Sequence, residues 1–204
     1  MMRSIIYMGF VFCIASCNFK NTKIHGPDTS FLEDKIVEEI AKYYHEIYAD
    51  ENILVLETSD SVVDITYFED ASNTESFENY RAHIEIPIKN ESDQILYGDL
   101  NKDHNDDLIV GVFIEGGGGG GNMYWVDYFV FLKRENNYLL STVVSNREIS
   151  DCDNGFIYFE KIEDNRIIGT TSCFVEGDSR CCPSIHYKTV LEFVDESFVL
   201  KSEE

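Results

Sequence analysis

The stretch "DLIVGVFIEGGGGGGNMYWVDYFVFLKRENNYLLSTVVS", residues 107–145, decides the fold. Three runs rich in β-branched and aromatic residues occupy 107–115, 122–134 and 138–145, separated by glycines and by "ENN". Short runs of this composition, bounded by turn residues, are typical of β-strands. The turn residues at 135–137 favour a tight antiparallel connection. This region therefore predicts successive strands joined as hairpins.

The same pattern continues on both sides of this stretch. Further strand-like runs occupy residues 61–68, 83–88, 94–100, 155–162, 166–175, 185–194 and 197–200, with an "EDN" turn at 163–165. Upstream, residues 30–50 carry apolar side chains at helical spacing, and Ser30 with Glu33 forms a capping-box pattern. We therefore expect one α+β domain over residues 29–204, with an N-terminal amphipathic helix packed on a mostly antiparallel sheet.

A ladder of oxygen-bearing side chains precedes the central strands. Counted from the first aspartate, its members stand at positions 1, 3, 5, 7 and 9: Asp99, Asn101, Asp103, Asn105 and Asp107. Alternate oxygens on a tight loop can converge on Ca²⁺, which takes about six to eight oxygen ligands. Val110 stands at position 12 in place of the bidentate glutamate, so an EF-hand is excluded. Two interpretations stay open: a calcium site that stiffens a hairpin, or a turn held by its own Asp and Asn side chains.

The ladder and the strand after it, "GDLNKDHNDDLIVGVF", resemble the D-x-[DN]-x-D-G-x-x-D-L loop of FG-GAP/VCBS-type repeats. The order of a ladder, a glycine-rich turn, an aromatic strand and "CCPS" at 181–184 also resembles bacterial lipoproteins of the LppP/LprE type, over roughly residues 97–200. This resemblance implies export and membrane anchoring, but no activity. The chain departs from the loop pattern at His104, where the pattern has a glycine that serves the sharp turn.

The six glycines at 116–121 do not form a phosphate-binding motif. Such a motif requires defined glycine spacing at the start of a helix, whereas this run leads into a strand. We expect the run to link two antiparallel strands. The neighbouring Tyr124 and Trp125 are aromatic residues of the kind that anchor interfaces, and they are candidates for interaction or for the core.

Four of the six cysteines follow the N-terminal segment: Cys152, Cys173, Cys181 and Cys182. An even number in an exported chain is typical of two disulfides. A bond between the neighbours Cys181 and Cys182 would strain the peptide between them, so we expect each to pair with one of the other two. The alternative is a zinc site built from these cysteines and His186.

The N-terminal segment "MMRSIIYMGFVFCIASC" has the order of a secretory signal: one cation, an apolar run and small residues before Cys17. Ile14 to Cys17 resembles a lipobox, in which cleavage leaves the lipidated cysteine as the new N-terminus. The expectation is a signal peptide over 1–17, lipid on Cys17 and a polar tether over 18–28. Asn18 follows in place of an aspartate that would resemble a retention signal, which favours the outer membrane.

Residues 18–204 carry 15 basic and 38 acidic side chains, a net charge of −23. This charge excludes nucleic acid as a partner and suits cations or basic proteins. No G-x-S-x-G or H-E-x-x-H motif is present, and the five histidines lack metal-ligand spacing. We therefore expect a non-catalytic binding module at the cell envelope, with no cofactor other than Ca²⁺. The alternative function is an immunity or inhibitor protein that neutralises a basic toxin or a lysozyme-like enzyme.

Overall fold

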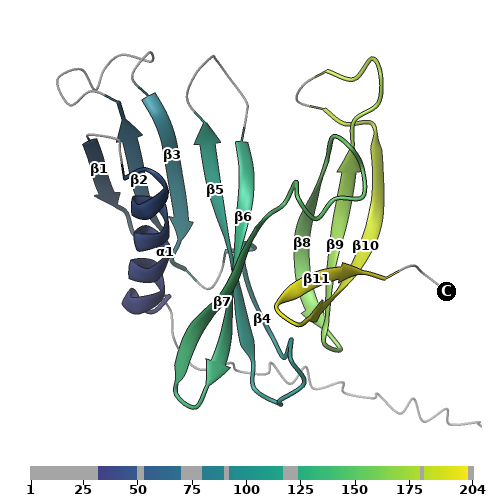
Figure 1. Ribbon diagram of the computed structural model, residues 1–204, viewed down its shortest axis with the longest axis horizontal. Coiled ribbons are helices and arrows are strands. Elements are labelled where there is room, and N and C mark those ends of the chain that lie inside the picture. The colour runs from purple at the N-terminus through teal and green to yellow at the C-terminus, as the bar shows by residue number, and fades with distance from the viewer. Residues whose placement is uncertain are drawn as a thin grey trace, which may run out of the picture.

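A computed structural model describes residues 32–49, 53–69, 80–89, 92–116, 124–179 and 182–201 (Figure 1). Helix α1 spans Asp34–Ile47, and the strands are β1 Ile53–Thr58, β2 Val62–Phe68, β3 Tyr80–Pro87, β4 Ile95–Gly98, β5 Asp107–Gly116, β6 Tyr124–Arg134, β7 Asn137–Ser145, β8 Gly155–Glu163, β9 Arg166–Cys173, β10 Ile185–Val194 and β11 Ser197–Leu200. The predicted signal peptide, Cys17, the tether and glycines 117–121 lie outside the described residues. Within the described ranges, no helix has the length and apolar character needed to cross a membrane.

The strands form two antiparallel sheets. Sheet A has the order β1-β2-β3-β5-β6-β7, with the short strand β4 also pairing with β5, and sheet B has the order β11-β10-β9-β8. Helix α1 lies across strands β2 and β3 of sheet A (Figure 1). Sheet B lies past strands β5 and β6 of sheet A (Figure 1). The chain therefore leaves sheet A at β7 and completes sheet B without returning.

Two apolar clusters hold these layers together. In the first, Ile36, Ile40 and Tyr44 of α1 pack with Ile65 of β2 and Phe129 of β6. The second lies on the opposite face of sheet A, and its buried members are Leu96, Leu100, Ile109, Val126, Tyr128, Val130, Leu132, Ile157, Phe159, Ile167, Leu191 and Phe193. Strands β5 and β6 contribute to both clusters because successive side chains of a strand point to opposite faces. These two strands are consequently buried on both sides, which accounts for their nearly continuous apolar sequences.

The predicted α+β class is wrong. The described chain is a mainly β structure of two antiparallel sheets, with a single helix of 14 residues. The expected capping box does not match the start of the helix, because α1 begins at Asp34 with Glu33 as its N-cap and the Glu33 side chain makes no capping hydrogen bond; Ser30 lies outside the described residues. Strand β1 was not predicted, because its apolar run "ILVL" at 53–56 directly follows the helical pattern.

The predicted turn sites connect neighbouring strands. Glu135 begins the connection from β6 to β7 with a φ of 55°. Asp164 and Asn165 link β8 to β9 with φ values of 51° and 60°. In the β8–β9 connection, positive φ at both central residues is the signature of a type I′ turn. In the β6–β7 connection only Glu135 has positive φ, and the antiparallel register of the two strands defines the hairpin. Both hairpin predictions are therefore confirmed.

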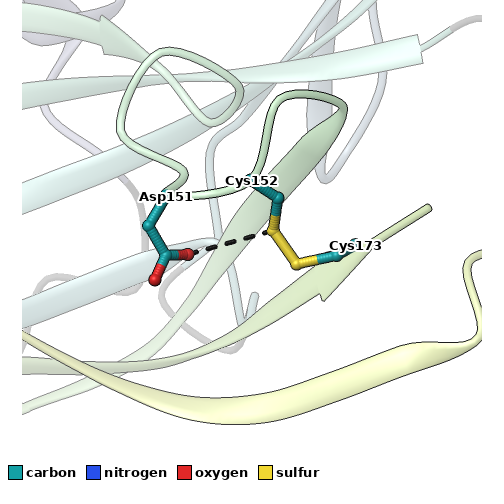
Figure 2. A group of neighbouring side chains, drawn as sticks. All are labelled: Asp151, Cys152 and Cys173. Atoms are coloured by element: carbon teal, nitrogen blue, oxygen red, sulfur yellow. Dashed lines mark hydrogen bonds between the residues drawn. A yellow bond between two sulfur atoms is a disulfide. The ribbon is translucent and has the colours of Figure 1, made fainter. Parts of the chain in front are cut away.

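The disulfide pairing differs from the prediction. Cys152 precedes β8, Cys173 ends β9, and the two are bonded to each other (Figure 2). The register explains this pairing, because Gly155 lies opposite Cys173 and brings the chain before β8 to the end of β9. Cys182 therefore pairs with neither of them, and Cys181 lies outside the described residues.

Candidate functional site

One face of sheet A is only partly covered. The second apolar cluster lies between sheets A and B. Among the described residues, none of its buried members comes from β2 or β3. In the central parts of these strands, the side chains that point away from α1 are polar, and side chains of neighbouring strands extend the same surface. We call the following residues the open face: Asp64, Thr66, His83, Glu85, Phe113, Glu115 and Tyr124.

The strand register brings the members of the open face together. Asp64 of β2 lies opposite Glu85 of β3, and Glu85 lies opposite Phe113 of β5. In the adjacent row, His83 lies opposite Glu115 of β5, and Glu115 lies opposite Tyr124 of β6. Directly opposed side chains on one face have Cβ atoms about 4.5–5.5 Å apart. Residues more than 50 positions apart in sequence therefore share one small surface.

His83 lies at the centre of this surface. Its Nε2 atom is 3.6 Å from Asp64 Oδ1 and 3.4 Å from Glu85 Oε1. Its Nδ1 atom shares a hydrogen bond of 2.9 Å with Thr66 Oγ1. The imidazole is therefore held at both nitrogens, between one hydroxyl and two carboxylates.

An open pocket of about 230 Å³ lies beside His83. Its lining combines charged and aromatic side chains: His83, Glu85, Phe113, Glu115 and Tyr124. The rings of Phe113 and Tyr124 are 6.3 Å apart between centroids, and the Tyr124 side chain is 47% exposed. A few polar groups in an apolar lining are typical of ligand sites. The pocket therefore offers apolar contact next to negative charge.

The two predicted aromatic anchors occupy different surroundings. Tyr124 lies at the pocket, whereas Trp125 is partly buried against the cluster beneath α1. The guanidinium of Arg147 lies 5.6 Å from the Trp125 ring centroid, and it also donates a hydrogen bond of 3.2 Å to the Tyr124 backbone carbonyl. The geometry thus assigns Trp125 to packing and leaves Tyr124 available for contact.

The acidic ladder forms the loop between β4 and β5, and its side chains bond to its own backbone. The Asp99 carboxylate accepts hydrogen bonds from the N–H groups of Asp103 and His104, at 3.1 and 2.9 Å. Asp103 accepts the N–H of Asn105 at 2.9 Å, and this bond is the main cause of a lowered pKa for Asp103. His104, which replaces the expected glycine, has a φ of 69°, in the left-handed region that glycine adopts most cheaply.

These hydrogen bonds explain the shape of the loop in the way that the turn interpretation predicts. Asn101 also takes part, since its amide oxygen accepts the N–H of Asp103 at 3.0 Å. The oxygens of Asp99, Asn101, Asp103 and Asn105 are of the type that calcium prefers, so calcium binding here stays a prediction.

Asp107, the last member of the ladder, has a structural role. It is fully buried, and its two carboxylate oxygens each accept a backbone N–H at 2.9 Å, from Leu100 and from Lys133. Burial raises the pKa of Asp107, and the two backbone hydrogen bonds oppose that effect. The residue therefore ties the ladder loop to the end of β6.

The cysteines do not form a thiolate metal site in the described residues. Cys152 and Cys173 are joined in the disulfide, so neither offers the thiolate that zinc requires (Figure 2). The Asp151 carboxylate lies 3.9 Å from Cys152 Sγ, and it accepts a hydrogen bond from the Tyr187 hydroxyl. The Nδ1 atom of His186 shares a hydrogen bond of 2.8 Å with Ser172 Oγ. The alternative of a cysteine zinc site is therefore wrong for these two cysteines.

Another ionisable pair lies beneath the helix. The Tyr44 hydroxyl donates a hydrogen bond of 2.9 Å to Asp127 Oδ2. Burial raises the pKa of Asp127 to about 6, the nearby Glu148 carboxylate adds to the rise, and the Tyr44 bond opposes it. Because the pair lies in the packed layer between α1 and sheet A, it affects stability and does not belong to the open face.

Asp64, His83 and Glu85 were not predicted as a site. The alternation in "SVVDITYF" and "HIEIPI" places their side chains on the polar side of each strand. That signal was present, but the register between the strands was needed to bring the three together.

No known protein family matches the chain, and neither do any curated protein or solved structure.

Proposed function

We propose that this protein is a non-catalytic binding module of the bacterial cell envelope, anchored by lipid on Cys17, and that the open face is its binding surface. One observation carries the proposal: sheet A leaves an acidic face with an aromatic-lined pocket uncovered. Most of the apolar side chains of sheet A pack against α1 or sheet B.

The chemistry of the open face favours a basic protein as partner. Asp64, Glu85 and Glu115 give the face three carboxylates, and the chain has a net charge of −22. Arg81 of β3 offers no unopposed positive charge nearby, because its guanidinium pairs with Glu69. Opposite charge accelerates association and selects the partner, while a partly exposed tyrosine supplies apolar contact. An arginine or lysine side chain of a partner would fit between Tyr124 and the carboxylates.

The more specific form of this function is an inhibitor or immunity protein. A small acidic lipoprotein is suited to bind a basic toxin or a lysozyme-like enzyme, because the charges attract at long range. Capture experiments with the tagged protein separate the two forms. A single stoichiometric basic toxin or hydrolase, released by salt, supports inhibition. A basic partner without such activity supports the general binding module, and no salt-sensitive partner contradicts both.

The anchor is tested by replacing the cysteine that would carry lipid. In Cys17→Ala, cleavage and lipidation at this position are lost, so the protein is expected to leave the outer-membrane fraction of the cell. Detergent-free fractionation followed by immunoblotting measures this change, and Cys13→Ala serves as the matched control. Retention of Cys17→Ala in the outer membrane would show that Cys17 is not the anchor.

A further inference from the structure

The side chains around His83 have the composition and spacing of a metal site. The ligand atoms of Asp64, His83 and Glu85 all lie within 4.8 Å of one another. All three come from the central parts of neighbouring paired strands, so the backbone that carries them is held by the hydrogen bonds between β2 and β3. A site on rigid strands holds its ligands more firmly than one on a loop.

The two distances from the His83 nitrogen suit a small tetrahedral ion. With zinc–nitrogen and zinc–oxygen bonds of roughly 2.0–2.2 Å, tetrahedral geometry places neighbouring ligand atoms about 3.3–3.6 Å apart. The observed distances from His83 Nε2 are 3.6 Å to Asp64 and 3.4 Å to Glu85. Both exceed the roughly 2.7–2.9 Å of a charge-assisted hydrogen bond.

Thr66 completes the arrangement that a metal-binding histidine requires. A histidine that binds metal through Nε2 carries its proton on Nδ1, and another group usually accepts that proton in a hydrogen bond. Thr66 Oγ1 lies 2.9 Å from His83 Nδ1 and can accept it. The hydroxyl would thus fix both the tautomer and the orientation of the imidazole.

The pocket supplies space on the remaining side of the ion. His83 and Glu85 line it, so an ion held by the three side chains would border on an opening of about 230 Å³. Three protein ligands leave one tetrahedral position for water or for a group of a bound partner. Glu115 adds negative charge at the same opening, which favours a cation.

We propose that Asp64, His83 and Glu85 form a binding site for a divalent transition-metal ion, with zinc as the best match. Imidazole nitrogen combined with carboxylate oxygen suits zinc better than calcium or magnesium, which prefer oxygen alone. The site is separate from the acidic ladder, and it does not depend on the proposed protein partner.

Calorimetry on the full-length protein in detergent tests the site. The protein is first treated with a chelator, dialysed and then titrated with zinc chloride. We expect one zinc ion per chain, a loss of affinity of tenfold or more in both His83→Gln and Asp64→Asn, and a roughly tenfold loss in Thr66→Val. His186→Gln is the matched histidine control, because that residue lies on β10 and bonds to Ser172. Its zinc affinity is expected to equal that of the wild type.

Cobalt provides a second readout that does not depend on heat. Tetrahedral Co²⁺ bound to the wild type is expected to absorb visible light, and His83→Gln to lose that absorption. The melting temperature without metal establishes that each variant is folded. Absence of zinc binding by the wild type would overturn the proposal, as would unchanged zinc affinity in folded His83→Gln and Asp64→Asn.

A parallel titration with calcium keeps the two metal predictions apart. Calcium binding at the ladder should be lost in Asp103→Ala and retained in His83→Gln. Zinc binding that is lost in Asp103→Ala but kept in His83→Gln would move the zinc site to the ladder and contradict the proposal.

Discussion

Replacement of Asp107 by alanine is expected to lower the free energy of unfolding by roughly 2–5 kcal/mol. The side chain is fully buried and accepts the N–H groups of Leu100 and Lys133. Alanine would leave both donors without their acceptor, and each buried unsatisfied group costs about 1–3 kcal/mol. The link between the ladder loop and the end of β6 would be lost at the same time.

Urea unfolding followed by tryptophan fluorescence measures this loss, because Trp125 lies in sheet A. Asp107→Asn keeps one acceptor oxygen and should lose less stability than Asp107→Ala. Asp106→Ala is the matched control, since Asp106 is exposed, and its effect should stay within about 0.5 kcal/mol. Equal stability of Asp107→Ala and the wild type would show that Asp107 does not hold the loop.

Asp127→Asn is expected to gain stability relative to the wild type as pH rises. Burial raises the folded-state pKa of Asp127 to about 6, whereas an unfolded aspartate titrates near about 3.9. The folded state therefore binds this proton more tightly. The stabilising effect of the group is fully present below about pH 4 and is lost as pH rises through about 6.

The difference in unfolding free energy between Asp127→Asn and the wild type should grow by roughly 2 kcal/mol from pH 4 to pH 7.5. Asparagine retains an oxygen that can accept the Tyr44 hydrogen bond, so packing beneath α1 is kept. Glu38→Gln is the control, because Glu38 is exposed on the helix, and its effect on the free energy of unfolding should stay within about 0.5 kcal/mol at both pH values. A pH-independent difference for Asp127→Asn would contradict the raised pKa.

Local sequence patterns predicted the strands of this protein better than its class. Each run predicted after residue 60 overlaps a strand, because β-branched and aromatic residues bounded by turn residues encode this structure locally. The class was wrong for two reasons. The one helix predicted at 30–50 was given too much weight in assigning the class, and strand β1 was not predicted. Hydrophobic spacing in one segment also could not show that the strands divide into two sheets.

The candidate site shows the limit of sequence patterns more clearly. The ladder was visible because its residues are close together in sequence, yet burial gives Asp107 a structural role. Asp64 and His83 are 19 positions apart, and only the pairing of β2 with β3 brings them together. The disulfide likewise follows from the pairing of β8 with β9. Contacts of this kind depend on strand register, which a single sequence specifies only weakly.

Capture of partners by an open-face variant tests the central claim most directly. Glu115→Gln combined with Tyr124→Ala removes one charge and one ring from the pocket without changing the three proposed zinc ligands. Glu38→Gln combined with Leu139→Ala is the matched control, because both of these residues are exposed away from the open face. Each tagged full-length protein is used at low and at high salt, and the captured basic protein is quantified.

We expect the wild type and the control to retain a basic partner equally at low salt and to release it at high salt. The pocket variant is expected to retain at least tenfold less, since a central aromatic residue and a charge at an interface can each contribute more than about 1 kcal/mol. Equal capture by the pocket variant and the wild type, with both proteins folded, would contradict the assignment of the open face as the binding surface.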